Sequence, residues 1–232
     1  MRCKPAPVQF YFTEMKKRMI EAMIFDRDGV IIDSERVHIE SVEQSLKAFK
    51  LKFNRKDFEF MMGVRPDDYK EIFLKKYPVD WEKYRALQRT KFYEILSKEH
   101  SIKEVVSLVR ELKRRKYKLG MATSSRKEPT TKILKLVGLE KAFDAIVTME
   151  ECTKRKPNPE PYLKAAEKLK VEPKKCLVFE DSQIGLESAK AAGMKCIIIK
   201  TNDFKQDFSK ADMVLEQKEV NFQRIKSFIK GD

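Results

Sequence analysis

The sequence predicts an α/β fold, a doubly wound parallel (Rossmann-like) sheet core with an inserted small α-helical domain. Two observations support this prediction. Short apolar runs that end in turn residues alternate with segments of helical periodicity, which is the pattern of successive βαβ units. Residues 35–100 interrupt that alternation, because they contain helical stripes but no clear strand. The 232 residues are enough for a core of this kind and its insertion.

Six apolar runs are the expected strands of the sheet. They lie at residues 22–25, 118–122, 145–148, 176–179, 196–199 and 213–215. In open parallel sheets, ligands bind beyond the carboxyl ends of the strands. The residues that follow each run are therefore the first candidates for a functional site.

Helical stripes separate most of these runs. Val105, Leu108, Val109 and Leu112 follow the i, i+3, i+4, i+7 spacing of one buried helix face. Residues 185–192 are small and predict a helix that approaches the sheet closely. Further stripes are expected at Ile133, Leu134 and Val137, closed by Gly138; at Tyr162, Leu163, Ala166 and Leu169, after Pro161; and at Ile225, Phe228 and Ile229.

The interruption of the pattern sets the expected domain limits. Residues 19–34 and 101–232 should form the α/β core, and residues 35–100 the inserted helical domain. Residues 1–18 match no later pattern and are expected to be an N-terminal extension. The helical stripes of the insertion are Ile39, Val42, Leu46 and Phe49, then Phe92, Ile95 and Leu96.

Composition excludes several classes of protein. Hydrophobic residues make up 42% of the chain, which is too many for a disordered protein, and no apolar run is long enough to span a membrane. Four scattered cysteines and two histidines offer no zinc-binding spacing, and they favour a reduced, cytoplasmic protein. The net charge is +14, yet residues 21–35 alone sum to −4, with five acidic residues and one basic.

The acidic segment contains Asp26-Arg27-Asp28-Gly29, at the end of the first expected strand. Two aspartates this close repel unless a cation or a shared proton intervenes. An EF-hand loop is excluded, because it needs glycine sixth and glutamate twelfth. A glycosidase pair is excluded, because such close residues cannot straddle a glycosidic bond. Two interpretations remain open here: a plain polar turn, or a nucleophilic aspartate beside an acid/base aspartate, with Mg²⁺.

Later strand ends carry residues suited to a phosphoryl group and a cation. Residues 123–125 all have side-chain hydroxyls, which can donate hydrogen bonds to phosphoryl oxygens. Lys156 precedes a proline-stiffened helix start, where its ammonium can neutralise a phosphoryl group as a point charge. Glu180 and Asp181 end another buried run in adjacent carboxylates. With the two earlier aspartates, they offer the oxygen ligands that Mg²⁺ prefers.

These motifs, in this order and at these strand ends, resemble the haloacid-dehalogenase-like superfamily. They are Asp26-x-Asp28-Gly29-Val30, Thr123-Ser124, Lys156-Pro157 and Glu180-Asp181-Ser182, followed by residues 183–193. The resemblance covers the chain from about residue 19 to the C-terminus. It is strongest to the beta-phosphoglucomutase-like and phosphoglycolate-phosphatase-like subgroup, and it implies that the inserted helical domain is a cap.

The resemblance implies a mechanism. Asp26 would attack phosphorus to give an aspartyl-phosphate, and Asp28 would serve as the general acid and then the general base. Thr123 and Lys156 would hold and neutralise the transferring phosphoryl group. Mg²⁺ would bind the Asp26 carboxylate, the Asp28 backbone carbonyl and Asp181, with Glu180 binding directly or through water.

The resemblance also suggests residues that contact substrate or its phosphate, and it has gaps. Gly29, Ser124 and Ser125 in the core are expected there, with His38 and Arg65 from the cap. His38 and Arg65 each have a second interpretation, as a helix-start histidine and a solvated charge.

Arg27 stands where the family is usually apolar, and the sequence leaves open whether it turns away or screens the carboxylates. Residues 99–102 also replace a Pro-Gly that the family commonly carries at the edge of the substrate pocket.

The leading hypothesis is a Mg²⁺-dependent phosphatase of a small phosphorylated metabolite. The alternative is a sugar phosphomutase, in which an alcohol accepts the phosphoryl group. A nucleic-acid-binding protein is disfavoured, because acidic and basic residues are interspersed except at residues 113–118. We expect no membrane association, and a monomer or weak homodimer.

Overall fold

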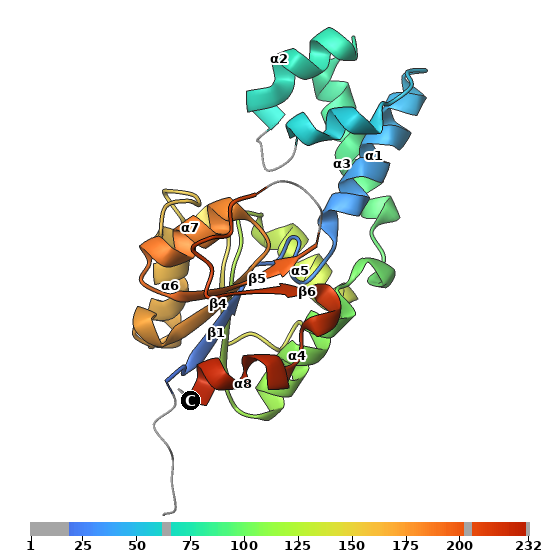
Figure 1. The fold of residues 1–232 in the computed structure, drawn as a ribbon. Coiled ribbons are helices and arrows are strands. Elements are labelled where there is room, and N and C mark those ends of the chain that lie inside the picture. The colour runs from blue at the N-terminus through green and yellow to red at the C-terminus, as the bar shows by residue number, and fades with distance from the viewer. Residues whose placement is uncertain (1–18, 62–65, 202–205, 231–232) are drawn as a thin grey trace, which may run out of the picture.

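The computed structural model describes residues 19–61, 66–201 and 206–230, and these form a six-stranded parallel sheet with helices on both faces (Figure 1). The strand order is β3-β2-β1-β4-β5-β6, and every neighbouring pair is parallel. The predicted fold class is confirmed. The strands are β1 Ala22–Phe25, β2 Lys118–Ala122, β3 Ala145–Val147, β4 Cys176–Glu180, β5 Lys195–Lys200 and β6 Met213–Glu216.

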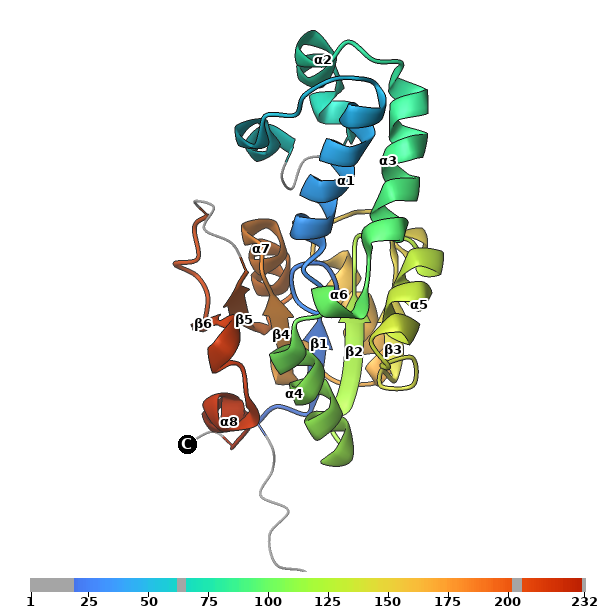
Figure 2. The ribbon, with the colours of Figure 1, turned by 90° about the vertical axis from the view of Figure 1, so that its right-hand side faces the viewer.

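Eight α-helices accompany the strands in the described residues. Helices α4, α5 and α8 pack on one face of the sheet, and α6 and α7 on the other (Figure 2). The helices are α1 Ser34–Ala48, α2 Pro66–Lys76, α3 Trp81–Ile95, α4 Lys103–Arg114, α5 Lys127–Leu136, α6 Glu160–Leu169, α7 Gln183–Ala191 and α8 Phe222–Lys230. All predicted strands and helices are present, with ends that shift by a few residues.

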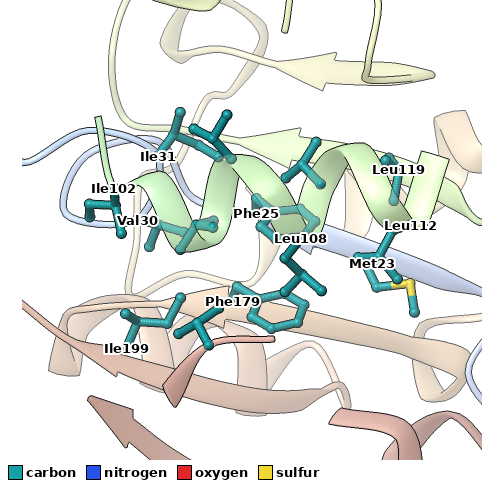
Figure 3. Packing of buried hydrophobic residues seen from close by; sticks show 14 of the residues in the cluster. Met23, Phe25, Val30, Ile31, Ile102, Leu108, Leu112, Leu119, Phe179 and Ile199 are labelled. Atoms are coloured by element: carbon teal, nitrogen blue, oxygen red, sulfur yellow. The ribbon is translucent and has the colours of Figure 1, made fainter. Parts of the chain in front are cut away.

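The core under α4 is closely packed, as Figure 3 shows. Leu108 and Leu112 of α4 lie over the sheet, where the rings of Phe25 and Phe179 stack 4.5 Å apart on neighbouring strands. All four side chains are at most 1% exposed. Because full burial of a large apolar side chain stabilises the fold by about 1.5–3 kcal/mol, this layer fixes the two central strands that carry the site.

One apolar assignment on the opposite face was wrong. Leu163 of α6 is 40% exposed, although the sequence stripe included it. The buried face of α6 runs instead through Tyr162, Ala165, Ala166 and Leu169, the i, i+3, i+4, i+7 positions. Leu163 lies one residue from Tyr162, about 100° around the helix, and so faces solvent.

The inserted helices have a core of their own. Phe73 lies at its centre, with its ring 4.6 Å from Tyr84 and 5.6 Å from Trp81. Figure 1 shows α1, α2 and α3 standing together, and the arrowheads of β1 and β4 point toward them in Figure 2. The inserted helical unit therefore lies over the carboxyl edge of the sheet, where the site was predicted.

The chain enters and leaves this unit at adjacent points. The backbone N–H of Asp33 donates to His100 O at 2.8 Å, and that of Ile102 donates to Ile31 O at 3.0 Å. Ile32 and Ser101 form an antiparallel bridge between these bonds. The two connections are thus paired into a short two-stranded stalk. The limits of residues 35 and 100 for the inserted domain stay a prediction.

Some sequence predictions concern cysteines and membranes. Cys176 and Cys196 are buried and form no disulfide within the described residues, and they pack there as small hydrophobic residues do. No helix within the described ranges has the length and apolar character needed to cross a bilayer. The proposed extension, residues 1–18, lies outside the described residues.

Candidate active site

Polar side chains from three neighbouring strands meet at the carboxyl edge of the sheet. Asp26 directly follows β1, and its backbone N–H donates to Phe179 O on β4 at 2.9 Å. Thr123 directly follows β2, where its N–H bonds Val147 O at 3.0 Å. Glu180 is the last residue of β4. The parallel ladder therefore brings together residues that lie up to 154 positions apart in the sequence.

Lys156 is the centre of the site. Its ammonium donates to Asp26 Oδ1 at 2.7 Å and to Glu180 Oε1 at 2.6 Å. It also donates to Ala122 O at 3.0 Å and lies 2.9 Å from Tyr162 Oη. The side chain is only 6% exposed. Desolvation opposes its charge, but the two carboxylates outweigh it and raise the pKa of Lys156, so it is a permanent cation here.

Glu180 is saturated with hydrogen-bond donors. Oε1 accepts from Lys156 and from the Tyr162 hydroxyl at 2.7 Å. Oε2 accepts from the Asp181 N–H at 3.0 Å and from both the N–H and the hydroxyl of Ser182. Burial acts to raise the pKa of Glu180, but these donors hold it below the ordinary value. Glu180 is therefore an anchor for Lys156 with little acceptor capacity left.

The described residues place three carboxylates close enough to share a cation. Ligand oxygens of Asp26, Glu180 and Asp181 all lie within 4.8 Å of one another. Burial raises the pKa of Asp26 to about 7, with Glu180 and Asp28 adding to the effect against Lys156. Burial and the same neighbours raise the pKa of Asp181 well above its ordinary value. One lysine does not balance three acids, so the cluster suits a divalent cation.

Two glycines make this crowding sterically feasible. A Cβ at Gly29 would lie 1.8 Å from Asp181 Oδ2, and the residue has φ +69°. A Cβ at Gly185, on α7, would lie 1.8 Å from Glu180 Oε1. The absence of a side chain at Gly29 leaves room for the Asp181 carboxylate, and the expected contact of Gly29 with phosphate stays a prediction. Gly185 realises the close helix approach that its small-residue segment predicted.

The second aspartate has a different partner. Asp28 accepts hydrogen bonds from Arg27, whose Nη2 donates to Oδ1 at 2.9 Å and to Oδ2 at 2.7 Å. Ser125 Oγ also donates to Asp28 Oδ2, at 2.9 Å. Burial acts to raise the pKa of Asp28, but Arg27 and Ser125 outweigh it and lower the pKa. Arg27 thus screens this carboxylate, which resolves the question that the sequence left open.

The remaining predicted site residues lie on the loop after β2 and on α1, apart from one outside the described residues. Thr123 is 2% exposed and accepts a hydrogen bond from the Ser125 N–H, while Ser124 is exposed. His38 lies on α1, with its ring centroid 4.5 Å from that of Phe92 on α3. Arg65 lies outside the described residues.

Sequence reasoning missed three polar residues around the site. Tyr162 was assigned to the core, which it joins with its ring, but its hydroxyl bonds Glu180. Thr130 accepts from Arg27 Nη1 at 3.2 Å. Gln88 of α3 is 2% exposed and donates to Ser41 Oγ, with Nε2 3.4 Å from His38 Nδ1. None carries a local sequence signal, because each partner lies far along the chain.

Fold and site together define an α/β enzyme that works with carboxylates and a buried lysine beneath an inserted helical unit. The haloacid dehalogenase-like hydrolase family matches residues 23–199, and the chain belongs to this family. The resemblance stated from the motifs is therefore confirmed.

Relatives of the chain carry phosphatase and phosphomutase names. The "Phosphorylated carbohydrates phosphatase" of Thermotoga maritima is 33% identical over 184 residues, which cover 77% of this chain and 84% of that protein. The "Beta-phosphoglucomutase" of Bacillus subtilis is 31% identical over 209 residues, covering 85% and 90%. The solved structure described as "putative beta-phosphoglucomutase from Thermotoga maritima" has a TM-score of 0.80 at 26% identity, covering 90% of this chain and all of that one.

Proposed function

We propose that the protein is a Mg²⁺-dependent phosphatase of a small phosphorylated metabolite, acting through an aspartyl-phosphate. The observation that carries the proposal is the placement of Asp26. Its carboxylate ends the central strand β1, bonds a buried ammonium through one oxygen, and borders two further carboxylates. A nucleophile needs this combination of a fixed position and nearby positive charge, because its phosphoryl target is anionic.

The proposed steps are those that the family resemblance implies for these side chains. An Asp26 oxygen attacks phosphorus, the bond from phosphorus to the ester oxygen breaks, and Asp28 gives that oxygen its proton. Asp28, now ionised, takes a proton from water, whose oxygen attacks the phosphorus and frees Asp26. Lys156 and Thr123 stabilise the phosphoryl charge in both steps. The products are the alcohol and inorganic phosphate.

Asp26 and Asp181 would hold Mg²⁺, together with the backbone carbonyl of Asp28. Protein donors already occupy the carboxylate oxygens of Glu180. We therefore expect Glu180 to hold Lys156 in place and to contact the ion through water. The bound ion supplies neutralisation of charge on the phosphoryl oxygens. The donor set fits, because it consists of hard oxygen ligands with a surplus of negative charge.

Relatives guide the expected substrate class. A relative named for phosphorylated carbohydrates favours a sugar phosphate or a similar metabolite. A phosphomutase is the second candidate, because one relative of comparable identity bears that name. In this alternative an alcohol takes the place of water as acceptor. The cytoplasmic location, the absence of a nucleic-acid partner and the monomeric or weakly dimeric state stay predictions.

The test is a screen of phosphorylated metabolites with Mg²⁺, using Asp26→Asn as the matched inactive variant. We expect phosphate release by the wild type and loss of at least about 10³-fold in the variant, as for removal of a nucleophile. Unchanged turnover in Asp26→Asn would eliminate the mechanism. Addition of a sugar bisphosphate primer separates the candidates, because isomerisation without phosphate release would identify a mutase.

A further inference from the structure

Arg27 is buried beside the site without contacting the carboxylates that form the acidic cluster. Its side chain is only 5% exposed, although it directly follows the proposed nucleophile. Removing a guanidinium from water is unfavourable unless its charge is paired and its hydrogen bonds are satisfied. A position that packs against α5 would otherwise suit an apolar residue. The presence of a charged side chain here therefore indicates that the hydrogen bonds of Arg27 have a role.

The guanidinium is fixed on both sides. Toward Asp28, Nη2 contacts both carboxylate oxygens, and Nε contacts Oδ2 at 3.1 Å. Toward α5, Nη1 donates to Thr130 Oγ1 at 3.2 Å, and that hydroxyl in turn donates to Arg126 O. Nη2 also donates to Ser125 Oγ at 2.6 Å, and Ser125 donates onward to Asp28. Arg27 thus ties one carboxylate to the loop and helix that follow β2.

The contacts fix the orientation of the Asp28 carboxylate. Four donor contacts, from Arg27 and Ser125, reach its two oxygens, three of them at Oδ2 and one at Oδ1. The Asp28 side chain stays 34% exposed, so water can reach it. A carboxylate that is held in one orientation and is open to water is placed to act as the base of the second step.

We infer that Arg27 is a positioning residue that aims the Asp28 carboxylate at the water which breaks the aspartyl-phosphate. This inference rests on the proposed function. In that step Asp28 takes a proton from water, the water oxygen bonds to phosphorus, and the bond from phosphorus to Asp26 breaks. Phosphate leaves, and the Asp28 proton serves the next substrate. Arg27 acts on the reaction through Asp28.

The experiment uses 4-nitrophenyl phosphate, whose leaving group departs without a proton. With Arg27→Leu, the first step should proceed and the second should slow. We expect kcat to fall by about 10- to 100-fold, the cost of a misplaced catalytic group. Because kcat/KM reports the first step, it should stay within about threefold of the wild-type value. A burst of one 4-nitrophenolate per site should appear, and intact-mass measurement after acid quench should show phosphorylated protein.

Two milder variants test the same positioning role if Arg27→Leu folds poorly. Arg27→Lys keeps the charge without the two-pronged contact, and Thr130→Val removes only the outer anchor. Both should show the same burst with smaller losses in kcat, about 3- to 10-fold. Arg115→Leu is the matched control, because Arg115 holds Glu111 through Nε and Nη2 on α4, far from the site. It should leave both kinetic constants unchanged.

The outcomes separate this inference from the proposed function. If kcat and kcat/KM fall together in Arg27→Leu, or if neither changes, the positioning role is refuted. A rise in kcat would mean that Arg27 restrains Asp28 unproductively, which also refutes it. If Asp28→Asn accumulates phosphorylated protein and Arg27→Leu does not, only this inference fails. If the wild type hydrolyses no phosphate ester and no variant is phosphorylated, the proposed function itself fails.

Discussion

Two ion-pair clusters flank the same turn, and they solve the burial of charge in different ways. In the lysine cluster, Lys156 serves Asp26 and Glu180 at once, with Asp181 close by, so negative charge is left over. In the arginine cluster, Arg27 serves Asp28 alone, and hydroxyls complete its contacts. Surplus negative charge therefore prepares the first cluster for a cation, while matched charge fixes the second in place.

The largest effect should come from Lys156→Met. It leaves two buried carboxylates without their cation, which costs about 3–5 kcal/mol in the free energy of unfolding. Turnover should fall by at least about 10²-fold, because charge stabilisation is lost in both steps. Urea unfolding and phosphate release measure the two effects. Lys154→Met, at an exposed position two residues away, is the control and should change neither.

If Lys156→Met kept the wild-type free energy of unfolding, the burial of these carboxylates would not depend on Lys156. The proposed difference between the two clusters would then be wrong. A double variant with Asp26→Asn sharpens the point. Removing one carboxylate should recover part of the lost stability, because the two residues are in contact and their effects are not additive.

The next effect concerns the close approach of Asp181 to Gly29. Gly29→Ala places a Cβ on the Asp181 carboxylate, which should disturb the acidic cluster and reduce turnover by about 10²-fold. Mg²⁺ should then raise the melting temperature less than it raises that of the wild type. Gly193→Ala is the matched control, because Gly193 has φ +73° and no atom within 4 Å of a Cβ.

Both glycine variants share the backbone strain of a left-handed alanine, about 1–2 kcal/mol. Only Gly29→Ala adds the contact with the carboxylate. Equal losses of turnover in the two variants would show that strain alone is responsible, and that Asp181 is not part of the site.

The smallest effect should come from Tyr162→Phe. Its hydroxyl bonds Glu180 and lies beside Lys156, and a hydrogen bond to a charged group contributes about 1.5–3 kcal/mol. Turnover should fall by about tenfold at most, since Lys156 keeps both carboxylates. Tyr84→Phe is the control, because the buried Tyr84 hydroxyl has no hydrogen-bond partner in the described residues. Thermal unfolding should show a loss only for Tyr162→Phe.

The sequence predicts the lysine cluster more fully than the arginine cluster. Asp26 follows and Glu180 ends a recognisable strand, and the parallel sheet brings such ends together, while Lys156 precedes a recognisable helix start. The direction of Arg27 depends on Thr130, which lies 103 residues later and is positioned by the start of α5. Tyr162 shows the same limit, because a ring in an apolar stripe gives no sign that its hydroxyl reaches a carboxylate.

The stalk formed by residues 31–33 and 100–102 also has a consequence for how such enzymes diversify. Its two strands are hydrogen-bonded, so the segment between them begins and ends at nearly the same place. An inserted segment with joined ends imposes little loop-closure entropy on the core, and this cost grows only slowly with its length. Lengthening, shortening or exchanging the segment should therefore alter what the protein recognises while the strand edge beneath keeps its chemistry.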